Sequence, residues 1–177
     1  ARGIVLCSEH AHTSYATAEL TWGLIIAAMR HIPQQMASLK RGEWQTRAGS
    51  VLRGRTLGIY GYGRIGKQVA GYGRAFGMRV LVWSREKSRA AALADGLEVA
   101  ASREALFAEA DVLSLHVRLI PETRGMVSAA DIARMKPAAI IANTSRAELI
   151  EEGALLNALR AGTIAGAAVD VFESEPM

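Results

Sequence analysis

The sequence predicts an α/β fold built on a doubly wound parallel sheet. Short apolar runs alternate with helical stretches from Thr56 onward, which is the pattern of successive strand–helix units. The 177 residues are 50% hydrophobic but only 6% aromatic, and 17 of them are glycine. This composition favours a closely packed layered fold over an aromatic-rich β-sandwich. The chain length suits one such domain.

Six apolar runs are expected to form strands: Thr56–Tyr60, Arg79–Trp83, Glu98–Ala100, Val112–Leu115, Ala139–Asn143 and Gly166–Val171. Helices are expected between them at Arg64–Phe76, Lys87–Ala94, Arg103–Ala108, Ala129–Met135 and Glu151–Ala161. Because a helix separates each strand from the next, the connections are crossovers and the sheet is parallel, covered on both faces. This pattern predicts the strand order 3-2-1-4-5-6.

The region before the first strand is expected to be helical. Leu20, Leu24 and Ala28 share one face of a helix from Ser14 to about Arg30, with Ser14 as a plausible cap. Pro33 suits the start of a second helix that ends near Gly42.

Charge and cysteine content exclude several classes of protein. The net charge of +4 comes from residues 30–55, where six basic residues face one acidic residue. Such a surplus is more typical of a solvated linker, or of a patch covered by another domain, than of a nucleic-acid surface. The longest apolar stretch has about ten residues, half of a membrane span. With a single cysteine, Cys7, and no visible leader, we expect a cytoplasmic protein without disulfide or metal site.

A glycine-rich turn joins the first strand to its helix and carries the strongest functional signal. Gly61 permits the tight turn, Gly63 lets a pyrophosphate approach the backbone, and Gly66 lets helix and strand pack closely. The helix start, at Arg64 and Ile65, offers unpaired N–H groups and a positive dipole end to phosphates. A tight turn without ligand is the alternative. We interpret the turn as a dinucleotide site in a Rossmann fold.

The end of the second strand bears on the choice of cofactor. Ser84 stands where an acidic residue would accept hydrogen bonds from the adenosine ribose and repel a 2′-phosphate. Arg85 follows directly and supplies a cation suited to that phosphate. The cofactor is therefore expected to be NAD(P), with NADP favoured over NAD. The alternative is that Arg85 is a solvated loop residue.

Further motifs occur in the same order as in a known family. The chain resembles the NAD(P)-dependent D-2-hydroxyacid dehydrogenases at Ala18-Glu19, Leu57–Gly66, Leu115–Val117, Pro121–Gly125, Asn143–Arg146, Ala154–Leu156 and Asp170–Pro176. The resemblance implies hydride transfer between NAD(P)H and a small 2-hydroxy or 2-keto acid. It also implies a domain division in which residues 1–12 end a substrate domain, 13–171 bind the dinucleotide and 172–177 return to the substrate domain.

The resemblance assigns roles at the carboxyl edge of the sheet. Arg146 follows an apolar strand and is expected to bind the substrate carboxylate and polarise the carbonyl, although Ala147 departs from the glycine usual in the family. Glu175 is expected to pair with a catalytic histidine and raise its pKa, and the neighbouring Glu173 is placed outside the site. The expected cofactor contacts at this edge come from His116, Thr144, Ser145 and Asp170.

The catalytic histidine of the family follows the Glu-Pro motif, whereas His10, His12, His31 and His116 all precede Glu175. This chain alone is therefore expected to bind a dinucleotide without turnover. An NAD(H)-sensing module like the family's corepressor relatives, or a fold that has lost catalysis, is the alternative. A homodimer is expected, with helix 14–30 in the contact, because its apolar residues cannot all point inward: Leu20, Trp22, Leu24, Ile25 and Ile26.

Overall fold

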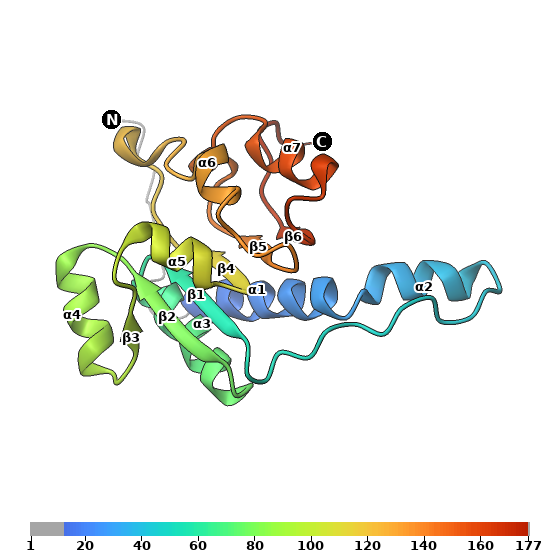
Figure 1. Cartoon of the computed structure of the whole chain (residues 1–177), viewed down its shortest axis with the longest axis horizontal. Coiled ribbons are helices and arrows are strands. Elements are labelled where there is room, and N and C mark those ends of the chain that lie inside the picture. Colours follow the sequence, from blue (N-terminus) through green and yellow to red (C-terminus); the bar gives the residue numbers. More distant parts are fainter. Residues whose placement is uncertain (1–12, 177) are drawn as a thin grey trace, which may run out of the picture.

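The structure, a computed structural model, describes residues 13–176, so the predicted hinge at 1–12 lies outside the described part. Six parallel strands form one sheet in the order β3-β2-β1-β4-β5-β6, which confirms the predicted topology (Figure 1). The strands are β1 (Thr56–Tyr60), β2 (Arg79–Trp83), β3 (Glu98–Val99), β4 (Val112–Leu115), β5 (Ile140–Asn143) and β6 (Gly166–Val169).

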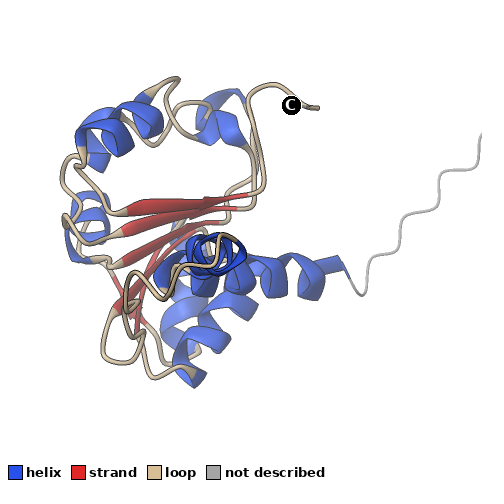
Figure 2. Cartoon of the chain, turned by 90° about the vertical axis from the view of Figure 1, so that its right-hand side faces the viewer, coloured by secondary structure: helices blue, strands red, loops and turns tan. Residues whose placement is uncertain are grey.

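Helices cover both faces of the sheet, as crossover connections require (Figure 2). One face is packed by α1 (Thr13–Met29) and α3 (Arg64–Ala75), and α4 (Glu86–Ala94) lies beside β2 and β3. The other face is covered by α5 (Arg103–Glu109), α6 (Ala129–Ile132) and α7 (Ala154–Ala161). No helix in the described residues is long and apolar enough to cross a membrane.

Each face of the sheet has its own hydrophobic core. Trp22 and Ile25 of α1 pack with Val69 of α3 on the first face. Phe107 of α5 and Ile132 of α6 pack on the second face. The central strands are buried on both sides, which explains why they read as continuous apolar runs in the sequence.

An arm projects from this layered body. Helix α2 (Ile32–Lys40) continues in the direction of α1 and extends away from the sheet (Figure 1). Residues 41–55 return beside it. The Gln35 side chain ties the returning segment to α2, because Thr46 donates its backbone N–H to Gln35 Oε1 at 3.1 Å. Most of the basic residues of the 30–55 region lie on this arm.

Three predicted boundaries differ from the structure by two residues or more. Helix α7 begins at Ala154 instead of Glu151, because Gly153 has a φ of +73° and Glu151 donates its N–H to Val127 O at 2.9 Å. Helix α6 ends at Ile132, after which Arg134 and Met135 bond only three residues back and Pro137 follows. Strand β6 ends at Val169, two residues early.

Candidate dinucleotide and substrate site

The three glycines of the turn between β1 and α3 are needed for different reasons. A Cβ at Gly61, where φ is +100°, would lie 2.5 Å from His116 O, and one at Gly66 would lie 2.2 Å from Gly61 O. These two glycines are therefore required by packing. A Cβ at Gly63 would meet no atom within 4 Å. Gly63 thus opens a cradle in front of the first residues of α3, where a diphosphate would fit.

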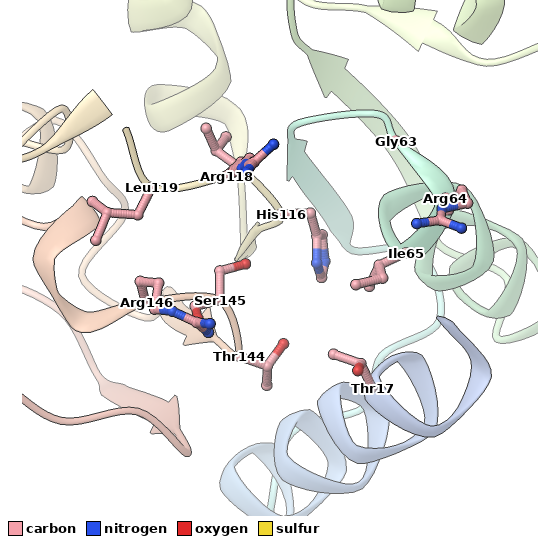
Figure 3. Close-up of a pocket in the computed structure, with 11 residues that line it drawn as sticks. Thr17, Gly63, Arg64, Ile65, His116, Arg118, Leu119, Thr144, Ser145 and Arg146 are labelled. Carbon is pink, nitrogen blue, oxygen red and sulfur yellow. The ribbon is translucent and has the colours of Figure 1, made fainter. Parts of the chain in front are cut away.

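Two cavities flank this cradle at the carboxyl edge of the sheet. The first, about 490 Å³, extends from the cradle to the loop after β5 and the start of α1 (Figure 3). The second, about 430 Å³, extends toward the end of β2. Four residues line both cavities and so mark their junction: Gly63, His116, Val117 and Arg118.

The loop after β5 brings Thr144, Ser145 and Arg146 to the first cavity (Figure 3). The buried side chain of Asn143 shapes this loop: its Nδ2 donates to Arg146 O at 2.8 Å, and its Oδ1 accepts from Ser145 N at 3.0 Å. Ser145 Oγ donates to Leu115 O at 2.8 Å, which ties the loop to the end of β4. The exposed Arg146 guanidinium is thus carried on a braced loop and is available to an anion.

His116 lies between the cradle and the loop after β5 (Figure 3). Its Nε2 is 2.8 Å from Ser114 Oγ, whereas its Nδ1 has no partner, alone among the buried side-chain nitrogen and oxygen atoms of the described residues. Burial lowers the pKa of His116 to about 4, so the ring is neutral near pH 7. His116 lines both cavities, although its unpaired Nδ1 is itself buried.

The second cavity has the features expected for the adenosine half of a dinucleotide. Trp83, Ser84, Arg85 and Ser88 line it. Ser84 Oγ accepts the backbone N–H of Tyr62 at 3.2 Å, so Ser84 is bonded to the glycine turn and no carboxylate stands at this position. Within the described part of the chain, the Arg85 guanidinium has no hydrogen-bond or ion-pair partner.

Asp170 and Glu175 follow β6 and line neither of these two cavities. Glu175 Oε1 accepts the N–H of Phe172 at 2.9 Å, so this carboxylate braces its own turn. Desolvation raises the pKa of Asp170; the charge of Glu175 adds to this effect and that of Arg146 opposes it. The three groups are therefore close enough to interact electrostatically at the same edge of the sheet.

Several cavity residues were not found from the sequence. Arg118 lines both cavities, Ser88 lines the second, and Thr17 reaches the first from α1 (Figure 3). Arg118 had a usable signal, since it stands three residues after the end of β4, at the ligand-binding edge of a parallel sheet. Thr17 had none, because its position depends on how α1 packs. Among residues 13–176, no group of His, Cys, Asp or Glu could hold a metal ion.

A doubly wound sheet with an open glycine cradle, a cavity on either side and an unpaired buried nitrogen defines a dinucleotide-binding domain of the Rossmann type. Comparison with known families gives the same class and a more specific assignment. Residues 22–177 match the family "D-isomer specific 2-hydroxyacid dehydrogenase, NAD binding domain". The chain belongs to this family and is its NAD-binding domain.

Individual relatives are similar over nearly the whole chain. D-3-phosphoglycerate dehydrogenase of Methanocaldococcus jannaschii is 45% identical over 99% of this chain and 34% of its own length. Glyoxylate reductase of Aeropyrum pernix is 42% identical over 99% of this chain and 55% of its own. A solved phosphoglycerate oxidoreductase from Vibrio cholerae O395 superposes with a TM-score of 0.90 at 49% identity, over 93% of this chain and 53% of that one. The chain thus spans a third to about half of these relatives.

Proposed function

We propose that this chain is the cofactor-binding part of an enzyme that transfers a hydride between NAD(P)H and a small 2-keto acid, giving a D-2-hydroxy acid. The observation that carries the proposal is the position of Arg146, which lines the same cavity as the glycine cradle. The nicotinamide, when bound, supplies or accepts the hydride. The relatives named above are dehydrogenases, reductases and an oxidoreductase, which supports this reaction class.

Arg146 is suited to hold the substrate. Its planar guanidinium pairs with a carboxylate through two parallel hydrogen bonds and stays protonated, and it also polarises the adjacent carbonyl. The remaining requirement is a proton donor for the developing alkoxide. His31 lies at the start of the arm, and His116 is a partly buried residue whose lowered pKa keeps it neutral near pH 7, so we assign this role to neither. We therefore expect this chain by itself to bind the cofactor without measurable turnover.

Binding of a substrate mimic tests the role of Arg146. Oxalate resembles the carboxylate and carbonyl of a 2-keto acid, and we expect it to change the fluorescence of NADH or NADPH bound to this chain. Arg146→Gln should abolish that change while the cofactor still binds. Arg134→Gln, on an exposed arginine outside both cavities, is the matched control. An equal response of the Arg146→Gln variant to oxalate would contradict the proposal.

We further propose that NADP is favoured over NAD. Ser84 carries no charge to repel a 2′-phosphate, and Arg85 and Ser88 line the same cavity with donors suited to it. Arg89 is held over the Trp83 ring at 4.7 Å and places a second cation near this wall. Arg118, at the junction of the two cavities, faces the position of the diphosphate, which NAD and NADP share.

Calorimetric titration of the chain with NADPH and NADH distinguishes the proposed role of Arg85 at the 2′-phosphate from that of Arg118 at the diphosphate. Arg85→Ala is expected to weaken the binding of NADPH by roughly tenfold, which corresponds to the loss of one charge-assisted hydrogen bond. The affinity for NADH should stay nearly unchanged. Arg118→Ala is expected to weaken both cofactors by the same factor. Lys87→Ala, an exposed neighbour outside the cavity, is the control. Equal or tighter binding of NADH by the unaltered chain would overturn the preference.

A small 2-keto acid or 2-hydroxy acid is the substrate class that these residues support, because Arg146 needs a carboxylate partner.

We also propose a homodimer. The support for it is the exposed apolar stripe on the arm, formed by Ile32, Met36 and Leu39.

A further inference from the structure

Helix α1 places a fully buried hydroxyl against Thr144, one of the residues that line the first cavity. Thr21 has 0% exposed surface, and its Oγ1 donates to the backbone oxygen of Thr17 at 2.7 Å, one turn earlier in the helix. The same Oγ1 lies 2.7 Å from Oγ1 of Thr144, which lines the cavity from the loop after β5. A contact between residues 123 positions apart therefore joins α1 to the cofactor site.

The direction of this hydrogen bond follows from counting hydrogens. A threonine hydroxyl has one hydrogen and two acceptor lone pairs. The hydrogen of Thr21 is directed to the Thr17 carbonyl, which can only accept. In the bond between the two hydroxyls, Thr144 must then be the donor and Thr21 the acceptor. Thr144 has no hydrogen left for the cavity and presents only its lone pairs there.

We propose that Thr21 is a positioning residue that presets Thr144 as a hydrogen-bond acceptor for the nicotinamide half of the cofactor. The proposal rests on the proposed function, since it assigns the first cavity to that half. The groups that such an acceptor recognises are N–H and O–H donors. The nicotinamide half offers both, as the carboxamide N–H₂ and the ribose hydroxyls.

The surroundings of Thr144 favour this role over a purely structural one. Its side chain lies near those of His116 and Thr17 around the first cavity (Figure 3). Thr144 directly follows β5, so it stands at the carboxyl edge of the sheet, among the residues that line this cavity. The hydrogen of Thr144 is taken up inside the protein, so a ligand donor approaching Thr144 meets no competing donor.

Substitution of Thr21 tests the proposal without touching the cavity wall. Thr21→Val keeps the shape of the side chain but removes the acceptor, so the Thr144 hydroxyl is free to turn its hydrogen toward the ligand. We expect the Kd for NADH or NADPH, measured by calorimetry, to rise about three- to tenfold, as for loss of one neutral hydrogen bond. Thr21→Ser restores the acceptor and should restore affinity.

A double-mutant cycle distinguishes positioning from a general packing effect. Thr144→Val removes the acceptor itself, and adding Thr21→Val to it should cause no further loss of affinity. If Thr21 acts only through packing, the two losses will add, which overturns the proposal. Unchanged cofactor affinity in Thr21→Val, with an unchanged Tm, overturns it as well. If Thr21→Val does not fold, Thr144→Val against Thr144→Ser still measures the contact: an unchanged affinity in Thr144→Val overturns the proposal.

Titration with ADP-ribose identifies the donor group, because this molecule has the second ribose but no nicotinamide. A loss confined to NADH and NADPH assigns the contact to the carboxamide, and a loss shared by ADP-ribose assigns it to the ribose; either result supports the proposal. Failure of the unaltered chain to bind any of the three ligands would reject the proposed function and the assignment of this cavity together. Normal binding of all three with a Thr21→Val variant that matches the unaltered chain rejects the present inference alone.

Discussion

His116 shows how one residue can serve the site while weakening the protein at acid pH. Burial is the cause of its lowered pKa, about 4 against an ordinary value of 6.5. The neutral ring bonds to Ser114 through Nε2 and leaves its buried Nδ1 without a partner. A charged ring there would lack any compensating partner and would pay the cost of desolvation.

The lowered pKa of His116 is expected to make the folded protein less stable at acid pH. Between pH 6.5 and 4 the unfolded chain binds a proton at His116 that the folded chain excludes, so the free energy of unfolding decreases as the pH falls through this window. The full effect of this residue is on the order of 3 kcal/mol. Chemical denaturation at several pH values should show that His116→Gln loses less stability than the unaltered chain below pH 6.5. Parallel pH profiles for the two proteins would contradict this prediction.

The positions of residues that directly follow strands could be predicted from the sequence. The contacts that side chains make across the fold could not. The glycine turn and Arg146 stand directly after strands, so their place at the carboxyl edge follows from the parallel topology. The partner of Thr144 depends on a contact across the fold, the one between Thr21 and Thr144. Asp170 and Glu175 remain predictions, since neither lines the two cavities that flank the cradle.

At the scale of the element, the unit from β1 to α3 separates glycines needed for folding from a glycine needed for binding. Gly66→Ala brings a Cβ to 2.2 Å from the backbone oxygen of Gly61, and relief of that overlap should cost about 1–3 kcal/mol of stability or more. Gly63→Ala meets no protein atom, and its stability should change by no more than about 1 kcal/mol. Denaturant unfolding measures both changes.

Gly63→Ala is expected to weaken cofactor binding although it leaves the protein stable. Gly63→Ala places a methyl group in the cradle and is expected to weaken NADH and NADPH binding by roughly tenfold or more, about 1.4 kcal/mol, while the protein stays folded. Titration of folded Gly63→Ala is the deciding measurement. Affinity equal to that of the unaltered chain would show that the diphosphate does not approach Gly63.

The elements themselves were largely predictable, because strands and helices differ so clearly in this chain. Strands buried on both faces give continuous apolar runs, and amphipathic helices such as α3 separate them. The start of α7 was predicted wrongly because it depends on a contact outside the local sequence. Glu151 was predicted to start this helix but instead donates its N–H to Val127, 24 positions earlier.

At the scale of the whole molecule, the fold covers most of the apolar residues of helix 14–30 on which the expected dimer contact was based, and a homodimer remains our prediction. Trp22 and Ile25 are buried, and Leu24 and Ile26 are partly buried against the core, so only Leu20 of that group is exposed. Helix α1 packs against β5 and β6 on one side and against α3 beside it, and these contacts cover most of its apolar side chains. Several of the exposed large apolar side chains lie instead on the arm, whose position the sequence does not predict.

The arm carries large apolar side chains in a pattern suited to a contact with a second copy. Ile32, Met36 and Leu39 recur at spacings of four and three residues and so share one face of α2, with exposed fractions of 41%, 54% and 56%. Trp44, on the returning segment, is 83% exposed. Apolar surface of this kind on a projecting element is typical of a protein–protein interface.

We therefore predict that the protein is a dimer in solution and that its contact includes the arm. Met36→Glu combined with Leu39→Glu places two like charges in the contact and should convert the protein to a monomer in light scattering at micromolar concentration. Gln34→Glu, on the opposite face of α2, is the control and should leave the dimer intact. Because the arm projects away from both cavities, cofactor affinity should stay unchanged in the monomeric variant. A monomer before any substitution would refute the prediction, and a dimer that survives the two substitutions would place the contact elsewhere on the surface.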